Sequence, residues 1–160
     1  MVATPIGASA RYIPEGTTRY NWLPACANYN SPTRAEINAG TDLTPEIAAT
    51  GNWGIVSASI DAPDLATTFT AQIGGKVTVD GPTIDMYADS TSTDVRTLLP
   101  RGTNGFILKL PEGDVAGRKC DVFPVRVLAQ AKPTNFTNPS VIQLSFAPTR
   151  NPVENVVVPA

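Results

Sequence analysis

The 160-residue chain has no histidine and only two cysteines, and charged residues make up 16% of it. Without histidine, Ser-His and Cys-His nucleophile pairs are excluded, as are the commonest general base and most transition-metal sites. Cys26 and Cys120 lie far apart and form no CxxC pattern. We therefore expect buried free thiols, although a disulfide is possible if the fold brings the two together. The sequence predicts a non-enzymatic protein without a cofactor or metal.

Other patterns of chemical sites are absent too. Gly74 and Gly75 follow a predicted strand but lack the spacing that places backbone amides around a phosphate, so we interpret them as a turn. Asp61 with Asp64, like other close carboxylate pairs, does not match an EF-hand loop and is interpreted as solvated surface. Aromatic residues make up only 7% of the chain, which disfavours a carbohydrate-binding module.

Long apolar runs are also missing. Residues 1–10 contain no basic region followed by an apolar stretch, and no segment approaches the roughly 20 apolar residues of a membrane helix. We expect a soluble protein that is made and used without export and that has no membrane partner.

Charge is distributed unevenly along the chain. Residues 1–34 carry a net charge of +2 and residues 35–95 a net charge of −8, with Lys76 as the single base of that middle part. Residues 96–160 carry eight basic and four acidic side chains, a net of +4. Without clustered Lys and Arg, tight nucleic-acid binding is not supported. Such polarity suits a subunit whose acidic part meets the basic part of a neighbour, but a folded chain can equally mix the two.

What is present indicates a single, mainly β domain. The length fits one core, and Thr, Pro, Gly and Val recur throughout, which is typical of short strands joined by turns. Apart from segments 56–61 and 68–73, which the next paragraph describes, strands are expected at 19–23, 77–79, 83–87, 106–110, 121–129, 141–147 and 156–158. Three of them have an apolar set that should form the core: Phe106, Leu108 and Leu110; Phe123, Val125 and Val127; Ile142, Leu144 and Phe146.

Two short helices and one two-faced ribbon complete the expectation. Ser31 and Pro32 predict a helix start, with a helix over 32–39 that Gly40 ends; a second is predicted over 92–99, capped by Ser92. Segments 56–61 and 68–73 alternate strictly between apolar and polar residues, and the connection at 62–67 is short enough for a hairpin.

Several stretches resemble a known family. They are SPTRAEI at 31–37 with GTDLT at 40–44, LPRGTNGF at 99–106, LPEGDVAG at 110–117, DVFPVRV at 121–127 and PVENVVVPA at 152–160. In this order and at this length, they resemble the tail tube (major tail) proteins of long-tailed bacteriophages, especially siphophages of actinobacteria. The likeness covers the chain from about residue 31 to its end.

The resemblance implies a β-sandwich or partly closed barrel with a flanking short helix, assembled into homohexameric rings. Stacked rings would form the hollow tail tube of the virion, built in the host cytoplasm, through which genomic DNA and the tape-measure protein pass without specific binding. On that reading the ribbon lines the lumen, and arms at about 1–15 and 150–160 contact neighbouring subunits. The lumen-facing residues would be Ser57, Ser59, Asp61, Thr68, Thr70 and Gln72, and the arm residues Arg11, Glu154, Val156, Val157 and Val158.

Competing interpretations stay open at this point. Tail terminators, head-tail connectors and capsid decoration proteins are β-rich virion components of similar size. A β-sandwich module that binds carbohydrate or another protein is a further alternative, and a histidine-free hydrolase is the last.

Overall fold

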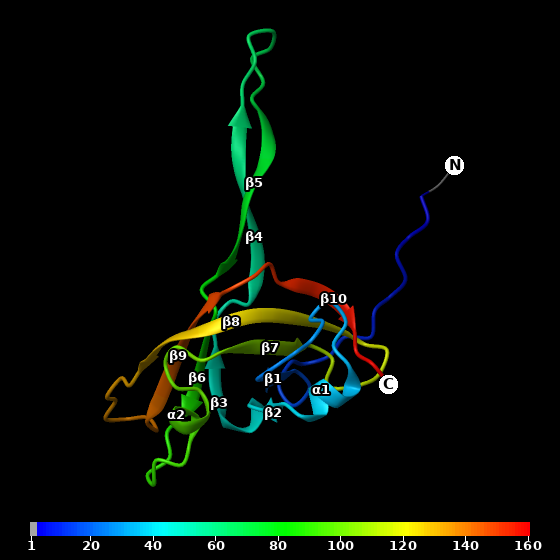
Figure 1. The fold of residues 1–160 in the computed structure, drawn as a ribbon. Helices are drawn as coiled ribbons and strands as arrows, with labels where there is room; N and C mark the ends of the chain where they lie inside the picture. Colours follow the sequence, from blue (N-terminus) through cyan, green and yellow to red (C-terminus); the bar gives the residue numbers. More distant parts are fainter. Residues whose placement is uncertain (1–2) are drawn as a thin grey trace.

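The computed structural model describes residues 3–160, and this part of the chain is mainly β (Figure 1). Its strands are β1 (Arg19–Leu23), β2 (Thr41–Asp42), β3 (Ile47–Thr50), β4 (Gly54–Ala62), β5 (Ala71–Asp80), β6 (Thr83–Tyr87), β7 (Asn104–Leu110), β8 (Lys119–Ala131), β9 (Val141–Pro148) and β10 (Val153–Val157). Its helices are α1 (Arg34–Asn38), α2 (Val95–Leu98) and the 3-10 turn η1 (Thr44–Glu46).

The body is one antiparallel sheet that does not close into a barrel. Strands follow the order β2-β1-β7-β8-β9-β6-β3, and β10 pairs with β8 beside this path. β4 and β5 form a separate two-stranded sheet that projects from the body (Figure 1). The mainly β class predicted from the sequence is confirmed, and the two sheets, which do not close into a barrel, are consistent with the β-sandwich form of the expectation.

Both faces of the central strands are buried, because successive side chains point to opposite sides of the sheet. Along β8, Phe123 and Val125 pack on one face, while Cys120 and Val122 pack on the other. The first core contains Tyr20, Trp22, Leu43, Trp53, Ile84, Met86, Val95, Leu99, Ile107, Phe123, Val125, Val127, Ile142, Leu144 and Phe146. The second contains Leu23, Ile37, Leu108, Leu110, Cys120, Val122, Val156 and Val158.

The predicted core sets are confirmed with one exception. Phe106 is only partly buried, stacked on Tyr29 at 6.0 Å between ring centroids, whereas the next residue, Ile107, is fully buried on the opposite face. Since β7 carries apolar residues at consecutive positions, alternation alone did not reveal that both of its faces are covered.

Helix α1 begins two residues later than predicted. Thr33 is its N-cap: the Thr33 side chain accepts a hydrogen bond from the Glu36 amide, and Glu36 accepts one from the Thr33 amide in return. Hydrogen bonds from the backbone of Thr33 and Ala27 lower the pKa of Glu36. Among the described residues, no helix is long and apolar enough to cross a membrane.

The start of α2 was also misassigned. Asp94, and not Ser92, caps this helix, because the Asp94 carboxylate accepts the Arg96 amide hydrogen bond. Ser92 instead adopts a left-handed conformation with φ of 65° in the turn before it. Val95 and Leu99 are buried as expected, while Leu98 stays 39% exposed.

Strand boundaries were predicted well in the body and poorly at the ribbon. β1 and β6 match their predicted ranges, whereas β2 and β3 were not predicted. Gly74 and Gly75 lie inside β5 and form no turn, so the strand predicted at 77–79 is a continuation of β5.

Both cysteines are free, and only one is fully buried. Burial raises the pKa of the Cys120 thiol to about 11, because the thiolate would be deprived of water. The Cys120 thiol is therefore unreactive at neutral pH. Cys26 is partly exposed, which corrects the expectation that both thiols are buried.

Candidate functional site

Among the strands, β4 and β5 have the least support from the rest of the chain. They form a hairpin and pair only with each other, from Gly54 opposite Asp80 at the base to Ala62 opposite Ala71 near the tip. The outer edges of both strands are therefore unpaired in this subunit. An isolated two-stranded hairpin is only marginally stable in water, and open edges readily pair with another chain.

One face of this hairpin is apolar and exposed. Ile60 and Ile73 lie opposite each other in the register, and their side chains are 52% and 57% exposed. Val56, on the same face of β4, is 45% exposed. Ala58, Ala62 and Ala71 lie on the same face, and the polar Thr78 lies opposite Val56 near the base. A largely apolar face without cover is typical of a surface that binds another protein.

The opposite face is polar toward the tip. Asp61 pairs with Gln72, whose side-chain amide donates a 2.8 Å hydrogen bond to the Asp61 carboxylate. Ser57 and Ser59 precede Asp61 on the same side of β4, at alternate positions. Four of the six residues predicted to share a polar face therefore do so.

Thr68 and Thr70 do not belong to that face, because the second strand begins only at Ala71. The loop over 63–70 is organised by local hydrogen bonds. Asp64 accepts from the amides of Ala66 and Thr67, and the Thr67 hydroxyl accepts from the amide of Phe69. Such side-chain bonds compete with strand pairing, and they keep both threonines in the loop.

A bulge in β5 changes which residues face which side. Between Ser57 and Ser59, β4 advances by two residues while β5 advances by three, from Val77 to Gly74. Gly75 lies in the bulge, where an added Cβ would be 3.0 Å from the Ala58 carbonyl oxygen. Glycine is therefore favoured here by the close approach of the two strands, not by a turn.

The hairpin is anchored to the body only at its base. Trp53, the residue just before β4, is 4% exposed and packs its ring 5.1 Å from that of Phe123 and 5.4 Å from that of Phe146. Its indole N–H donates a 3.1 Å hydrogen bond to the Thr83 carbonyl. Ile55 and Val79 pack on the same core. The distal part of the hairpin has no such contacts.

The C-terminal segment is not a free arm. β10 pairs with β8, and Val156 and Val158 are 8% and 1% exposed in the second core. The side chains of these two valines are therefore used within the chain, which corrects their assignment as contacts to a neighbour. Glu154 and Val157 are exposed on the outer side of the strand. They remain available to a neighbouring subunit.

The N-terminal segment has few contacts with the body of the subunit. Every residue from 3 to 13 is exposed, and no hydrogen bond or ion pair between described residues involves this segment. Ile6 and Ile13 are 99% and 71% exposed. Residues 1 and 2 of the predicted arm lie outside the described residues. Arg11 is the only charged residue of the described segment.

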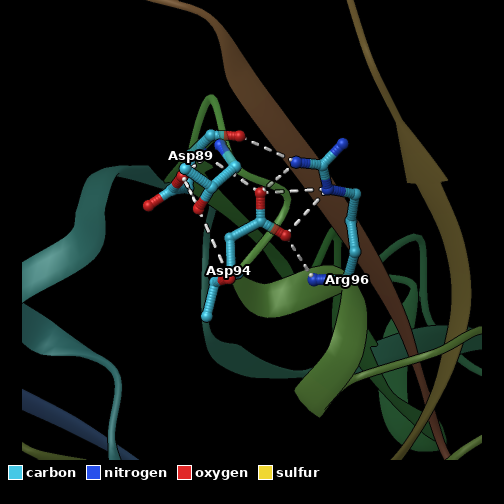
Figure 2. A network of polar contacts seen from close by, with 5 residues as sticks. Asp89, Asp94 and Arg96 are labelled. Carbon is cyan, nitrogen blue, oxygen red and sulfur yellow. Dashed lines mark hydrogen bonds and ion pairs between the residues drawn. The ribbon is translucent and has the colours of Figure 1, made fainter.

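A charged network fixes helix α2 to the end of β6 (Figure 2). Arg96 donates through Nε to both carboxylate oxygens of Asp94, at 2.8 and 2.9 Å, and its Nη2 donates to the Asp89 carbonyl at 3.0 Å. Asp94 also accepts the Asp89 amide at 3.0 Å. The Asp94 side chain is only 6% exposed. Hydrogen bonds from the Arg96 side chain hold the pKa of Asp94 well below its usual range.

The lowered pKa of Asp94 predicts that the protein loses folding stability in acid. Because Asp94 binds its proton more weakly in the folded state, its contribution is fully present above its ordinary pKa of 3.8 and is lost as pH falls below that value. Urea unfolding between about pH 4 and about pH 2 should therefore show a smaller loss of stability for Asp94→Asn than for the unmodified protein. Equal losses in the two proteins would contradict this.

In residues 3–160, no three His, Cys, Asp or Glu side chains come close enough together to hold a metal ion. The described polar clusters are hydrogen-bonded structural contacts that position α2, α1 and the hairpin loop.

A family model described as "Phage tail tube protein" matches residues 8–160. No curated protein matches the chain. The matched region includes the hairpin, both helices and β10, and it begins within the exposed N-terminal segment.

Proposed function

The chain belongs to the phage tail tube protein family and is a structural component of the tail, and we propose that it assembles into homohexameric rings that stack as a hollow tube conducting DNA during ejection. The proposal needs no catalytic activity. Partners would be other copies of the chain and other tail proteins, including the tape-measure protein inside the tube.

The exposed hairpin is the observation that supports this assembly most. Neighbouring copies placed side by side can pair the open edge of one β4 with the open edge of the next β5. Closure around a ring would leave no edge of the hairpin unpaired. The apolar face at Val56, Ile60 and Ile73 would then turn away from the lumen and be covered by neighbouring subunits.

The polar face suits the inside of such a tube. Ser57, Ser59, Asp61 and Gln72 would face the lumen, with Thr68 and Thr70 at the rim formed by the loops. No Lys or Arg occurs from Ala35 to Gly75. Lys76 in β5 is the single cation of the hairpin, so such a wall gives phosphates little to bind and DNA can pass without being held.

Electron microscopy of the purified protein tests the proposal directly. Hollow tubes or six-fold rings are expected. Single rings that never stack would favour a tail terminator or connector, and a protein that stays monomeric at high concentration would contradict assembly altogether.

Adding cations to the polar face should slow DNA passage. In phage carrying Ser59→Lys and Gln72→Lys, triggered DNA release is expected to be severalfold slower, with the delay shrinking at higher salt because phosphate contacts are screened. Release can be followed by the fluorescence of a DNA-binding dye. Thr134→Lys with Asn138→Lys, on an exposed loop of the body, is the matched control. Unchanged release from the hairpin variant would refute the lumen assignment.

A further inference from the structure

A second exposed apolar surface lies away from the hairpin. It is a groove of about 510 Å³ between η1, the end of β6 and helix α2. Leu43, Met86 and Val95 are buried side chains that form its floor, and Pro45 and Leu98 form its walls. No segment of the described chain fills it, and Leu98 remains 39% exposed as a result.

The elements on both sides of the groove are held in place by hydrogen bonds and ion pairs. Asp94 caps α2 and pairs with Arg96, which is bonded to the Asp89 carbonyl at the end of β6 (Figure 2). On the other side, Asp42 is paired with Arg19 at 2.9 Å. A preformed apolar groove binds an extended segment without first having to rearrange.

One acidic group at the rim has no cation beside it. Glu46 is exposed and forms no ion pair with any described residue, while the other two rim carboxylates, Asp42 and Asp94, are each paired with an arginine. The groove therefore offers an apolar floor with one uncompensated negative charge at its edge.

The N-terminal segment has the complementary chemistry. Residues 3–13 are exposed and form no helix or strand, with Ile6 almost wholly in solvent and Arg11 as the single charge, in no ion pair with a described residue. Eleven residues can span about 36 Å when extended, which is enough to reach a neighbouring molecule. Exposed apolar side chains on an undocked terminus require a partner to become ordered.

Segment and groove lie at different ends of the subunit. The N-terminal segment leaves the body on the side of α1 and the C-terminus, whereas α2 lies at the opposite end (Figure 1). With the docking segment on one side of the subunit and the groove on the other, the contact is heterologous. Each copy can then bind the next copy and be bound by the previous one.

From these observations we propose that residues 3–13 of one subunit dock in the groove of a neighbouring copy, with Ile6 on the apolar floor and Arg11 beside Glu46. The inference rests on the proposed self-assembly and identifies one of its contacts. Other occupants, such as the hairpin loop of a neighbour, become outcomes of the test.

A charge exchange tests the polar part of the contact. Arg11→Glu and Glu46→Arg should each raise the protein concentration needed for assembly, by up to about fivefold for one exposed ion pair. The double variant should restore the original concentration, because the pair is re-formed with its charges exchanged. A double variant that assembles no better than the worse single variant would overturn the pairing.

Cross-linking tests the apolar part. In a Cys26→Ser background, Ile6→Cys with Leu98→Cys should give, on oxidation, a ladder of covalent oligomers on a denaturing gel. Ile6→Cys with Phe136→Cys is the control, because Phe136 is 98% exposed and lies outside the groove. A product that stays monomeric, or an equal ladder from the control pair, would overturn the proposal.

A truncation separates this inference from the function it rests on. If the unmodified protein forms neither rings nor tubes, the tube function itself fails. If the unmodified protein forms tubes and a variant lacking residues 1–12 forms them equally well at the same concentration, the tube function stands and only the docked segment is refuted. We expect the unmodified protein to form tubes. The variant lacking residues 1–12 should need at least a tenfold higher protein concentration to assemble, which corresponds to a loss of about 1.4 kcal/mol per contact.

Discussion

Replacing Ile60 and Ile73 with aspartate is expected to give a folded monomer that forms no rings or tubes. The two side chains are already more than half exposed in the subunit, so their replacement leaves both cores of the body intact. The repulsion between the two opposite carboxylates acts only on the hairpin. In the proposed ring they are buried, and four carboxylate oxygens per subunit would have to lose water on an apolar surface. Assembly should therefore fail while folding is preserved.

Electron microscopy and size-exclusion chromatography measure the loss of assembly, and thermal unfolding measures the fold. Thr134→Asp with Asn138→Asp adds the same charge on an exposed loop of the body and should assemble normally. Tubes of ordinary appearance from the Ile60 and Ile73 variant would show that this face stays exposed to water in the assembly. The proposed role of the hairpin in subunit contacts would then be refuted.

Trp53→Ala should have the largest effect on the stability of the subunit itself. The Trp53 ring contacts Tyr20, Phe123 and Phe146 in the first core, with centroid separations of 6.3, 5.1 and 5.4 Å. Removing such a ring leaves a cavity and typically costs about 3–5 kcal/mol. Since small domains are stable by only about 5–15 kcal/mol, a large part of the stability would be lost.

Urea unfolding of the monomer gives this value, and Trp53→Phe is the matched control. Phenylalanine keeps most of the packing but loses the hydrogen bond to the Thr83 carbonyl, so a smaller loss of about 1 kcal/mol is expected from that bond. Equal midpoints for the alanine variant and the unmodified protein would mean that the base of the hairpin is held by other contacts.

The body of the fold could be predicted from the sequence because its strands alternate cleanly. The apolar sets of β8 and β9 were identified from period two alone, since both strands lie in the middle of the sheet. Trp53 gave no such signal: it stands between Asn52 and Gly54, outside any periodic run. Its burial depends on residues far away in the chain, which local pattern does not encode.

The candidate site was predicted in part, for equally local reasons. The alternation at 56–61 identified β4 and its polar side, but a bulge at Gly75 cannot be distinguished from a turn by composition. The C-terminal valines were assigned to a neighbour because their partner, β8, is more than 20 residues away in the sequence. The groove beside α2 could not be predicted from local patterns, because β2, η1, β6 and α2 must come together before it exists.

The anchoring of the hairpin at its base alone has a kinetic consequence for the proposed tube. A lone subunit gains little from ordering the distal hairpin, so the first few copies to associate must give up its conformational freedom with few contacts in return. Copies that add to a finished ring meet edges that are already ordered. Growth should therefore show a lag that preformed rings abolish, and free subunits would polymerise slowly until the first rings have formed.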